Sequence, residues 1–477
     1  MTAVVILLAA VAFLGCTVNL RTATITLILV GFLQDPLRKL VPGEPVFITA
    51  LICVFLVVAF LFAVLRHDPL GMQGIVAWRR SLRRPALFML WLIGVQCLRT
   101  FLVTGNPMLP IIGLISYLTP VPAIVIGSRM LGTPERVTKI LRVYMVLTVA
   151  LSLSVSLGFL GFKSRLLESV GSGLFIYGEK GPVELQTGFM RATEVTAWHI
   201  GAGVALAIVL ATRKRLRLGV LVPMVICAVW MLSTVILTGR RKILFGLVLF
   251  VIIYFLSLRF LTKSRRGGGV LVAAVVIAGG LLVVLPDMEM FRSSAGATYL
   301  ERTTNTSGFD RIGSLSGELY RVVYFNGLFG LGAGLGAQGS QHYGAGVGVV
   351  GGDAESGPGR IASELGVLGI FGLIWLAFAF VNESRRALRV LAARDKERAA
   401  IAAGFVSFLA MNSAIFLVYH QVFGDPFVLT MIGFVAGGVL GLSRLAPASS
   451  RERTHARATL PARAWAPPVP AGETASS

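Results

Sequence analysis

Charged residues are scarce in this sequence. They make up 14% of its 477 residues, whereas hydrophobic residues make up 55%. A soluble protein of this size carries about 25% charged residues. Apolar blocks of roughly 20 residues recur along the chain, which is the length that an α-helix needs to cross a hydrocarbon core about 30 Å thick. A soluble α/β protein is thereby excluded, and the sequence predicts an integral membrane protein.

Cysteines and processing signals are also few. The four cysteines, Cys16, Cys53, Cys97 and Cys227, lie in apolar segments, where they behave as small apolar residues and predict neither a disulfide nor a metal site. No basic segment or small-residue cleavage site marks a signal peptide at the N-terminus, so we expect residues 1–33 to remain in the mature protein.

The apolar blocks predict the fold class. Residues 1–33 are too long for one upright helix and short for two, so they form either one tilted span or a tight hairpin. The chain is therefore expected to be an all-α polytopic membrane protein with about twelve transmembrane helices, or thirteen with the hairpin. The other expected spans are residues 45–65, 86–105, 108–127, 142–162, 195–212, 218–238, 243–260, 268–286, 364–382, 400–420 and 427–444.

The excess of positive charge follows the predicted loops. One set of alternate loops, which includes the tail from Arg444, holds 28 Lys and Arg against 7 Asp and Glu, and the other set holds 15 of each. Because Lys and Arg are retained in the cytoplasm during insertion, the first set is predicted to be cytoplasmic and the second external. The net charge of +22 therefore reports topology and implies no nucleic-acid partner.

Two external segments are long enough to carry function. We expect N-terminal spans over residues 1–286, which include an external loop at 163–194, then a large periplasmic loop at 287–363 and C-terminal spans over 364–446. Residues 447–477 are rich in Ala, Pro, Ser and Arg without an apolar period, which predicts a disordered cytoplasmic tail. Long loops between spans often hold the functional groups.

The large loop contains an amphipathic pattern. Apolar residues recur at helical spacing over 312–322, while Arg311 and Arg321 lie on another face. This pattern is typical of a helix on the membrane surface, although Gly313 and Gly317 disfavour a regular helix.

A glycine-rich stretch follows at 327–352. No strand precedes it, so its glycine spacing does not indicate a nucleotide site. A flexible or closely packed loop at the membrane face accounts for it. The stretch contains His342, which is the best candidate among the external histidines for a proton acceptor.

A basic cluster lies on the predicted external side, against the positive-inside tendency. It consists of Arg240, Arg241 and Lys242, between two apolar segments. Such side chains either snorkel to the headgroups or bind a phosphate or diphosphate, which Arg contacts in bidentate fashion while keeping its charge. Three adjacent cations on so short a turn favour an anion site, which Arg191 and Arg321 would complete around a polyanionic headgroup.

Two glutamates flank the point where the large loop returns to the membrane. Glu355 and Glu364 lie in the segment AESGPGRIASELGVLG. A carboxylate in a partly desolvated layer has a raised pKa and can act as a general base. For Glu364 the alternative is a helix-start acid that the helix dipole favours.

The order of these segments resembles the O-antigen polymerase and O-antigen ligase superfamily. The resemblance covers residues 185–385, where TGRRKILFG ends a span, ELYRVVYFNGLFGLGAGLG lies in the large loop and ASELGVLGIFGL enters a span. By motif position, the matches are Arg241 to the turn arginine of the family, Arg321 to the loop arginine, Gly332–Gly336 to the Gly-x-Gly, Glu364–Gly369 to the re-entry, and Arg191 to a basic residue ahead of an earlier span.

One departure distinguishes this chain from the ligases. Where they place a catalytic His, about nine residues before the re-entry Glu, this chain has Glu355, and the segment has no His-Asn pair. The resemblance therefore implies a polymerase-type glycosyltransferase of the GT-C-like helical type, or a divergent member that uses a carboxylate.

The resemblance also implies a substrate and a location. The enzyme would join polyprenyl-diphosphate-linked oligosaccharide repeat units into an exopolysaccharide, capsule or O-antigen at the periplasmic face of a bacterial inner membrane. Arginines suit a diphosphate leaving group because they stabilise its developing charge, and the family implies neither a metal nor another cofactor. The implied partners are the lipid bilayer, the lipid-linked glycan, a chain-length regulator and other export components.

Two alternatives stay open. One is a ligase that transfers a finished glycan to another acceptor, and the other is a transporter or flippase, for which only Arg99 and the prolines near 110–122 give a hint. For the polymerase, the candidate catalytic residues are Glu355, Arg321 and Arg241, and the candidate substrate-binding residues are Arg191, Arg240, Lys242, Arg311, Glu364 and His342.

Overall fold

The structure is a computed structural model. It describes residues 2–65, 80–170, 175–178, 181–212, 218–261, 308–337, 340–343 and 354–444. The span expected at 268–286, the tail at 447–477 and residues 287–307 of the large loop lie outside the described residues.

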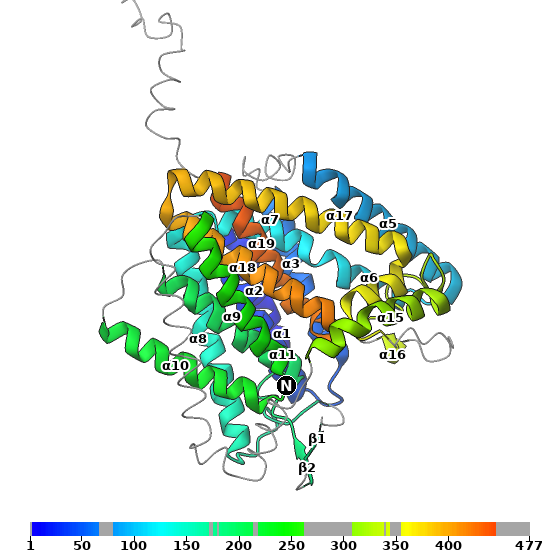
Figure 1. The fold of residues 1–477 in the computed structure, drawn as a ribbon. Coiled ribbons are helices and arrows are strands. Elements are labelled where there is room, and N and C mark those ends of the chain that lie inside the picture. Colours follow the sequence, from blue (N-terminus) through cyan, green and yellow to red (C-terminus); the bar gives the residue numbers. More distant parts are fainter. Residues whose placement is uncertain are drawn as a thin grey trace, which may run out of the picture.

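Helices account for most of the described chain (Figure 1). The first group is α1 (Thr2–Val18), α2 (Leu20–Leu40), α3 (Leu51–Leu65), α5 (Arg80–Thr104), α6 (Met108–Leu118), α7 (Pro120–Met130) and α8 (Pro134–Phe159). The second group is α9 (Thr193–Ala211), α10 (Leu218–Leu237), α11 (Arg241–Leu256), α15 (Gly308–Asn326), α16 (Ser340–Tyr343), α17 (Gly357–Arg394), α18 (Lys396–Val418) and α19 (Pro426–Arg444).

Short elements complete the described fold. Strands β1 (Phe175–Gly178) and β2 (Gly181–Glu184) form an antiparallel hairpin in which Phe175 lies opposite Glu184. Turns of 3-10 helix cover Val46–Ala50 and Gln421–Gly424, and a π-helical turn covers Ser257–Leu261.

The helices confirm a helical multi-pass membrane protein. Among the described residues, nine helices are long and apolar enough to cross a membrane. The spans expected from residue 45 onward coincide, within the described chain, with these helices or with the shorter apolar helix α10, whereas residues 1–33 fall on α1, a shorter apolar helix, and on α2, which is not among the nine. Their exposed apolar side chains, such as Leu102 and Phe378, fit a lipid environment.

Residues 2–40 form a helical hairpin rather than one tilted span. Asn19 separates α1 from α2, and its side-chain oxygen accepts the backbone N–H of Thr22 at 2.8 Å, so it caps α2. The two helices pack closely, because a Cβ atom at Gly15 would overlap the side chain of Thr26.

Helix α17 is 38 residues long and is kinked at Gly366, where φ is +69°. It begins earlier than the expected span, because Ser356 caps its N-terminus by accepting the N–H of Gly359 at 2.9 Å. Glu364 therefore lies at the end of a short helical segment before the kink. The alternative of a helix-start acid does not apply to it.

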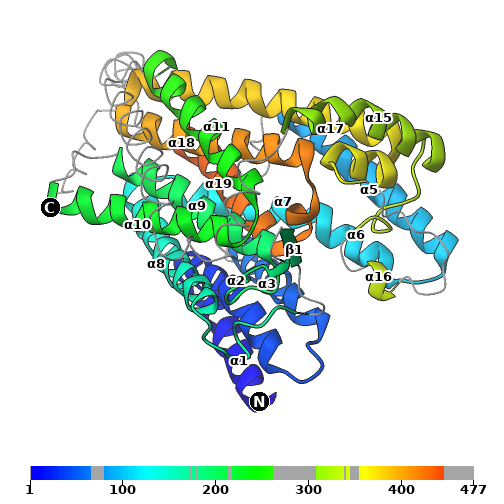
Figure 2. The same cartoon turned by 60° about the horizontal axis from the view of Figure 1, so that its bottom comes forward.

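The amphipathic helix predicted in the large loop is α15, and Gly313 and Gly317 do not interrupt it. Val322 is buried against α17, whereas Tyr324 is exposed. Figures 1 and 2 show α15 grouped with α5, α6 and α17 on one side of the molecule, away from α8 and α10.

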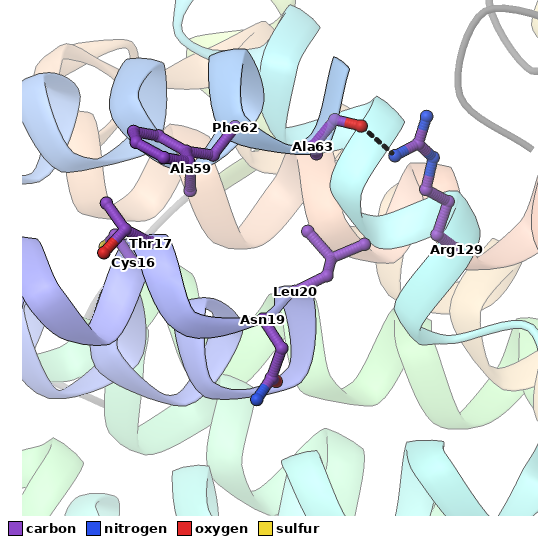
Figure 3. Close-up of a pocket in the computed structure, with 8 residues that line it drawn as sticks. All are labelled: Cys16, Thr17, Asn19, Leu20, Ala59, Phe62, Ala63 and Arg129. Carbon is purple, nitrogen blue, oxygen red and sulfur yellow. Dashed lines mark hydrogen bonds between the residues drawn. The ribbon is translucent and has the colours of Figure 1, made fainter. Parts of the chain in front are cut away.

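The polar groups considered below gather at one end of the bundle, which we call the site end. There α2 and α18 finish and α9, α11, α17 and α19 begin. A cavity of about 210 Å³ lies elsewhere, beside Asn19 and Arg129 (Figure 3). Asn19 precedes Asp35 by sixteen residues on α2, a distance of about 24 Å along a helix, so this cavity is not part of the site end.

The charge distribution predicts that the site end is external. We expect a periplasmic reporter, such as alkaline phosphatase, to be active when fused at residues 300 and 340. A cytoplasmic fluorescent reporter should be active at residues 390 and 460. Cytoplasmic activity at residue 340 would place the site on the wrong side for the function proposed below.

Candidate functional site

The connection between α18 and α19, residues 419–425, joins the polar groups of the site end. It leaves α18 at Tyr419, makes one 3-10 turn and enters α19 after Asp425. Its polar residues contact three different parts of the chain: Tyr419 contacts Glu194, His420 contacts Glu355 and Asp425 contacts Arg191.

Arg191 is held between two buried aspartates. Its guanidinium lies 3.1 Å from a carboxylate oxygen of Asp35 and 2.7 Å from one of Asp425. The other oxygen of Asp425 accepts the N–H groups of Phe427 and Val428, so Asp425 also caps α19. Burial alone would lower the pKa of Arg191, but the two carboxylates outweigh burial and raise it. The charge of Arg191 is thus permanent and balanced within the protein.

Lys39 fixes the external loop at 163–194 onto α2. Its side chain is 1% exposed, and its ammonium donates to the carbonyls of Gly188 at 2.7 Å and Leu166 at 3.1 Å. The loop is therefore anchored on both sides of the β-hairpin, which positions Arg191 and the start of α9.

Tyr419 contacts Lys242 directly and Arg240 through Glu194. The Arg240 guanidinium is 2.5 Å from a carboxylate oxygen of Glu194, and the Tyr419 hydroxyl donates to the same oxygen at 2.9 Å. The Lys242 ammonium lies 3.7 Å from the centroid of the Tyr419 ring, a cation–π contact. Burial and, after it, the charge of Glu194 raise the pKa of Tyr419, so its hydroxyl remains protonated.

The basic cluster sits at the N-terminus of α11. Arg240 is the residue before the helix, and Arg241 and Lys242 are its first two residues, all partly exposed. The helix dipole places partial positive charge at this end, so three cations here repel it. Glu194 supplies one negative charge to the cluster. Helix N-termini commonly bind anions, and the cations of this turn also attract them.

Glu355 lies between α15 and the 419–425 connection. Its main-chain carbonyl accepts from the N–H and from ring Nδ1 of His420, at 3.1 and 3.0 Å. The next residue, Ser356, donates its N–H and its hydroxyl to Glu318 of α15, at 3.0 and 3.1 Å. The Glu355 side chain is exposed, and its charge contributes to the raised pKa of Tyr419.

Glu364 is fully buried and binds neighbouring parts of the protein. One of its oxygens accepts the Tyr117 hydroxyl at 2.8 Å and the N–H of Gly334 at 3.0 Å, and the other lies 3.3 Å from Arg360 Nε. Arg360 is itself 5% exposed. This arrangement ties α6, α17 and the glycine-rich loop together and assigns Glu364 to positioning these segments.

The described part of the glycine-rich loop, residues 327–337, packs onto the kink of α17. Its backbone forms hydrogen bonds from Leu331 to Ser363 at 2.7 Å and from Gly332 to Glu364 at 3.1 Å. Gly366 frees these carbonyls by leaving the helical conformation. The sequence predicted either a flexible or a closely packed loop here, and residues 327–337 are closely packed.

Gly334 gives a test of this packing. Its φ is +95°, and a Cβ atom would overlap the carbonyl oxygen of Leu109 on α6. We expect Gly334→Ala to destabilise the protein by about 2 kcal/mol or more, measured as a lowered melting temperature in detergent. Gly313→Ala is the matched control, because Gly313 is helical and has no neighbour within 4 Å. A change at Gly334 no larger than that at Gly313 would contradict the packing.

The structure brings together some of the residues nominated from the sequence. Arg240, Lys242 and Glu355 all lie near Tyr419. Arg321 is exposed on α15, one helical turn after Glu318. Arg241 is half-buried and follows Arg240 in the chain. Arg191 and Glu364 form the buried ion pairs described above. Arg311 and His342 lie in α15 and α16, and their side chains are outside the described residues.

The sequence did not nominate Glu194, Tyr419 or Asp425, and His420 was one of the external histidines that ranked below His342 as a proton acceptor. Glu194 follows Arg191 by three residues in GFMRATEVTAWH, and Tyr419, His420 and Asp425 lie in VYHQVFGDPF. The sequence did contain a signal for these residues, because each segment has polar residues at the end of an apolar span. Only the fold shows that the two segments meet.

No model of a protein family matches the sequence, and a search of curated proteins finds no match.

Proposed function

We propose that this chain is a GT-C-like membrane glycosyltransferase that polymerises polyprenyl-diphosphate-linked oligosaccharide repeat units. The reaction would take place at the periplasmic face of a bacterial inner membrane and would yield an exopolysaccharide, capsule or O-antigen. The observation that carries this proposal is the convergence of Arg240, Lys242 and Glu355 around Tyr419. Cations for a leaving group thus lie near two groups that can take a proton from a nucleophile, Glu355 and the adjoining His420.

The basic cluster suits the leaving group. Transfer of a sugar from a polyprenyl diphosphate breaks the bond between the anomeric carbon and a diphosphate oxygen, and negative charge develops on that oxygen. Fixed cations at the N-terminus of α11 would stabilise this charge in the transition state. Arg191 supports the site indirectly, since its own charge is balanced by Asp35 and Asp425.

The position of the site suits a lipid-linked donor. The cluster lies where apolar helices begin and end, so a polyprenyl chain in the bilayer can reach it with its diphosphate at the membrane face. The exposed side of α15, with Tyr320, Tyr324 and Phe325, has the aromatic character of residues at membrane interfaces.

Deletion of the gene tests the proposal in cells. We expect long glycan chains to disappear while single lipid-linked repeat units accumulate in the membrane, and a plasmid copy should restore the chains. A ligase would give another result, because finished chains would accumulate on the lipid carrier. Unchanged surface glycan and unchanged lipid-linked units would contradict both readings.

A further inference from the structure

His420 is held in one orientation by the main chain of Glu355. Its backbone N–H and its ring Nδ1 both point at the Glu355 carbonyl, at 3.1 and 3.0 Å. A carbonyl oxygen only accepts hydrogen bonds, so Nδ1 must carry a proton. In the neutral ring the lone pair then lies on Nε2. The fold thus selects one tautomer of this histidine.

The Nε2 atom is available for a ligand. Within the part of the chain that the structure describes, no hydrogen bond reaches Nε2. His420 contacts the main-chain carbonyl of Glu355. It directly follows Tyr419, which contacts Lys242 and, through Glu194, Arg240. His420 therefore belongs to the same connection, residues 419–425, that contacts the basic cluster through Tyr419.

The charges around His420 favour its neutral form. Burial and the positive charge of Arg360 on α17 lower its pKa, while Glu364 on α17, Glu318 on α15 and the Glu355 carbonyl oppose them. The net pKa lies below the ordinary value of about 6.5. The ring is therefore unprotonated at neutral pH, as a proton acceptor must be.

We propose that His420 Nε2 is the general base of the transfer reaction and that Glu355 is a positioning residue, which acts through its main-chain carbonyl. The inference rests on the proposed glycosyltransferase function. The acceptor hydroxyl oxygen bonds to the anomeric carbon, and its proton passes to Nε2. The bond from that carbon to the diphosphate breaks, the polyprenyl diphosphate leaves with the electron pair, and His420 later releases the proton to water.

His420→Asn separates a base from a structural residue. The Asn amide can donate to the Glu355 carbonyl from the place of Nδ1, but it has no group that accepts a proton at neutral pH. We expect His420→Asn to retain the wild-type melting temperature and to lose about 100-fold or more in the rate of chain extension. Ser413→Ala, an exposed change on α18, is the control and should extend chains as the wild type does.

The assay uses purified protein in vesicles with lipid-linked repeat units extracted from the deletion strain. If the wild type extends chains and His420→Asn extends them at a rate within a few-fold of the wild type, the inference about His420 is wrong, while the proposed function stands. If the wild type itself extends nothing while the extracted units are intact, the proposed function fails instead.

The pH profile gives a second readout. A base must be deprotonated, so the wild-type rate should rise with pH through the lowered pKa of His420 and then level off. Glu355→Gln should keep this inflection, because its main-chain carbonyl remains, even if its rate falls. Loss of the inflection in Glu355→Gln would overturn the inference and give the role to the carboxylate.

Discussion

Arg241→Ala and Arg321→Ala are each expected to reduce chain extension about 100-fold or more, with the protein still present at its normal level in the membrane. Removal of one charged group that stabilises a developing charge typically costs a few kcal/mol of transition-state stabilisation. Arg241→Lys should also be poor, because a point charge cannot reproduce the planar guanidinium. The measurement is glycan chain length on gels together with the amount of single lipid-linked repeat units.

A matched variant controls for the loss of positive charge. Arg389 is exposed near the C-terminal end of α17, far along the helix from the site end. Arg389→Ala should leave chain length unchanged. Normal polymer in both Arg241→Ala and Arg321→Ala would show that neither arginine contacts the donor.

Asp425→Ala is expected to have the largest effect on stability. It removes the cap of α19 and leaves Arg191 with one buried carboxylate instead of two. Loss of a buried hydrogen bond to a charged group typically costs about 1.5–3 kcal/mol, and loss of the helix cap costs about 1 kcal/mol more, while Asp35 still balances the charge of Arg191. We expect a large fall in the melting temperature and low yields from detergent.

Asp395 gives a close comparison for Asp425. It caps α18 in the same way, accepting the N–H groups of Glu397 and Arg398 at 3.0 and 3.1 Å, but its ion pair with Arg398 is partly exposed. Asp395→Ala should therefore cost only about 1 kcal/mol. Equal destabilisation by the two variants would contradict a stabilising role for the buried pair with Arg191.

The sequence predicted the helices well because membrane spans depend on local hydropathy. An apolar run such as residues 45–65 is recognised as a span from its own sequence, without information on the segments that pack against it. The sequence left two alternatives for residues 1–33, one tilted span or a hairpin, because their length fits neither well. The structure shows two helices, separated at Asn19, which caps the second. The early start of α17 depended on Ser356 and on the kink at Gly366, which hydropathy does not report.

The site was less predictable, because its contacts join residues far apart in the chain. The basic residues 240–242 were visible as an exception to the charge rule. Their partner Glu194 and the connecting residue Tyr419 lie in other segments, and charge counting gives no information about which carboxylate meets which arginine. Arg191 looked like a ligand for an anion, whereas the fold supplies Asp35 and Asp425 to balance it.

The central claim is that this protein extends a polyprenyl-diphosphate-linked glycan, and purified protein tests it most directly. Vesicles would contain the wild-type protein, or Arg241→Ala, and lipid-linked repeat units as the only glycan. The account predicts a ladder of products that differ by one repeat unit, with release of polyprenyl diphosphate, for the wild type and almost none for Arg241→Ala. Intact single units after long incubation with folded wild-type protein would contradict it.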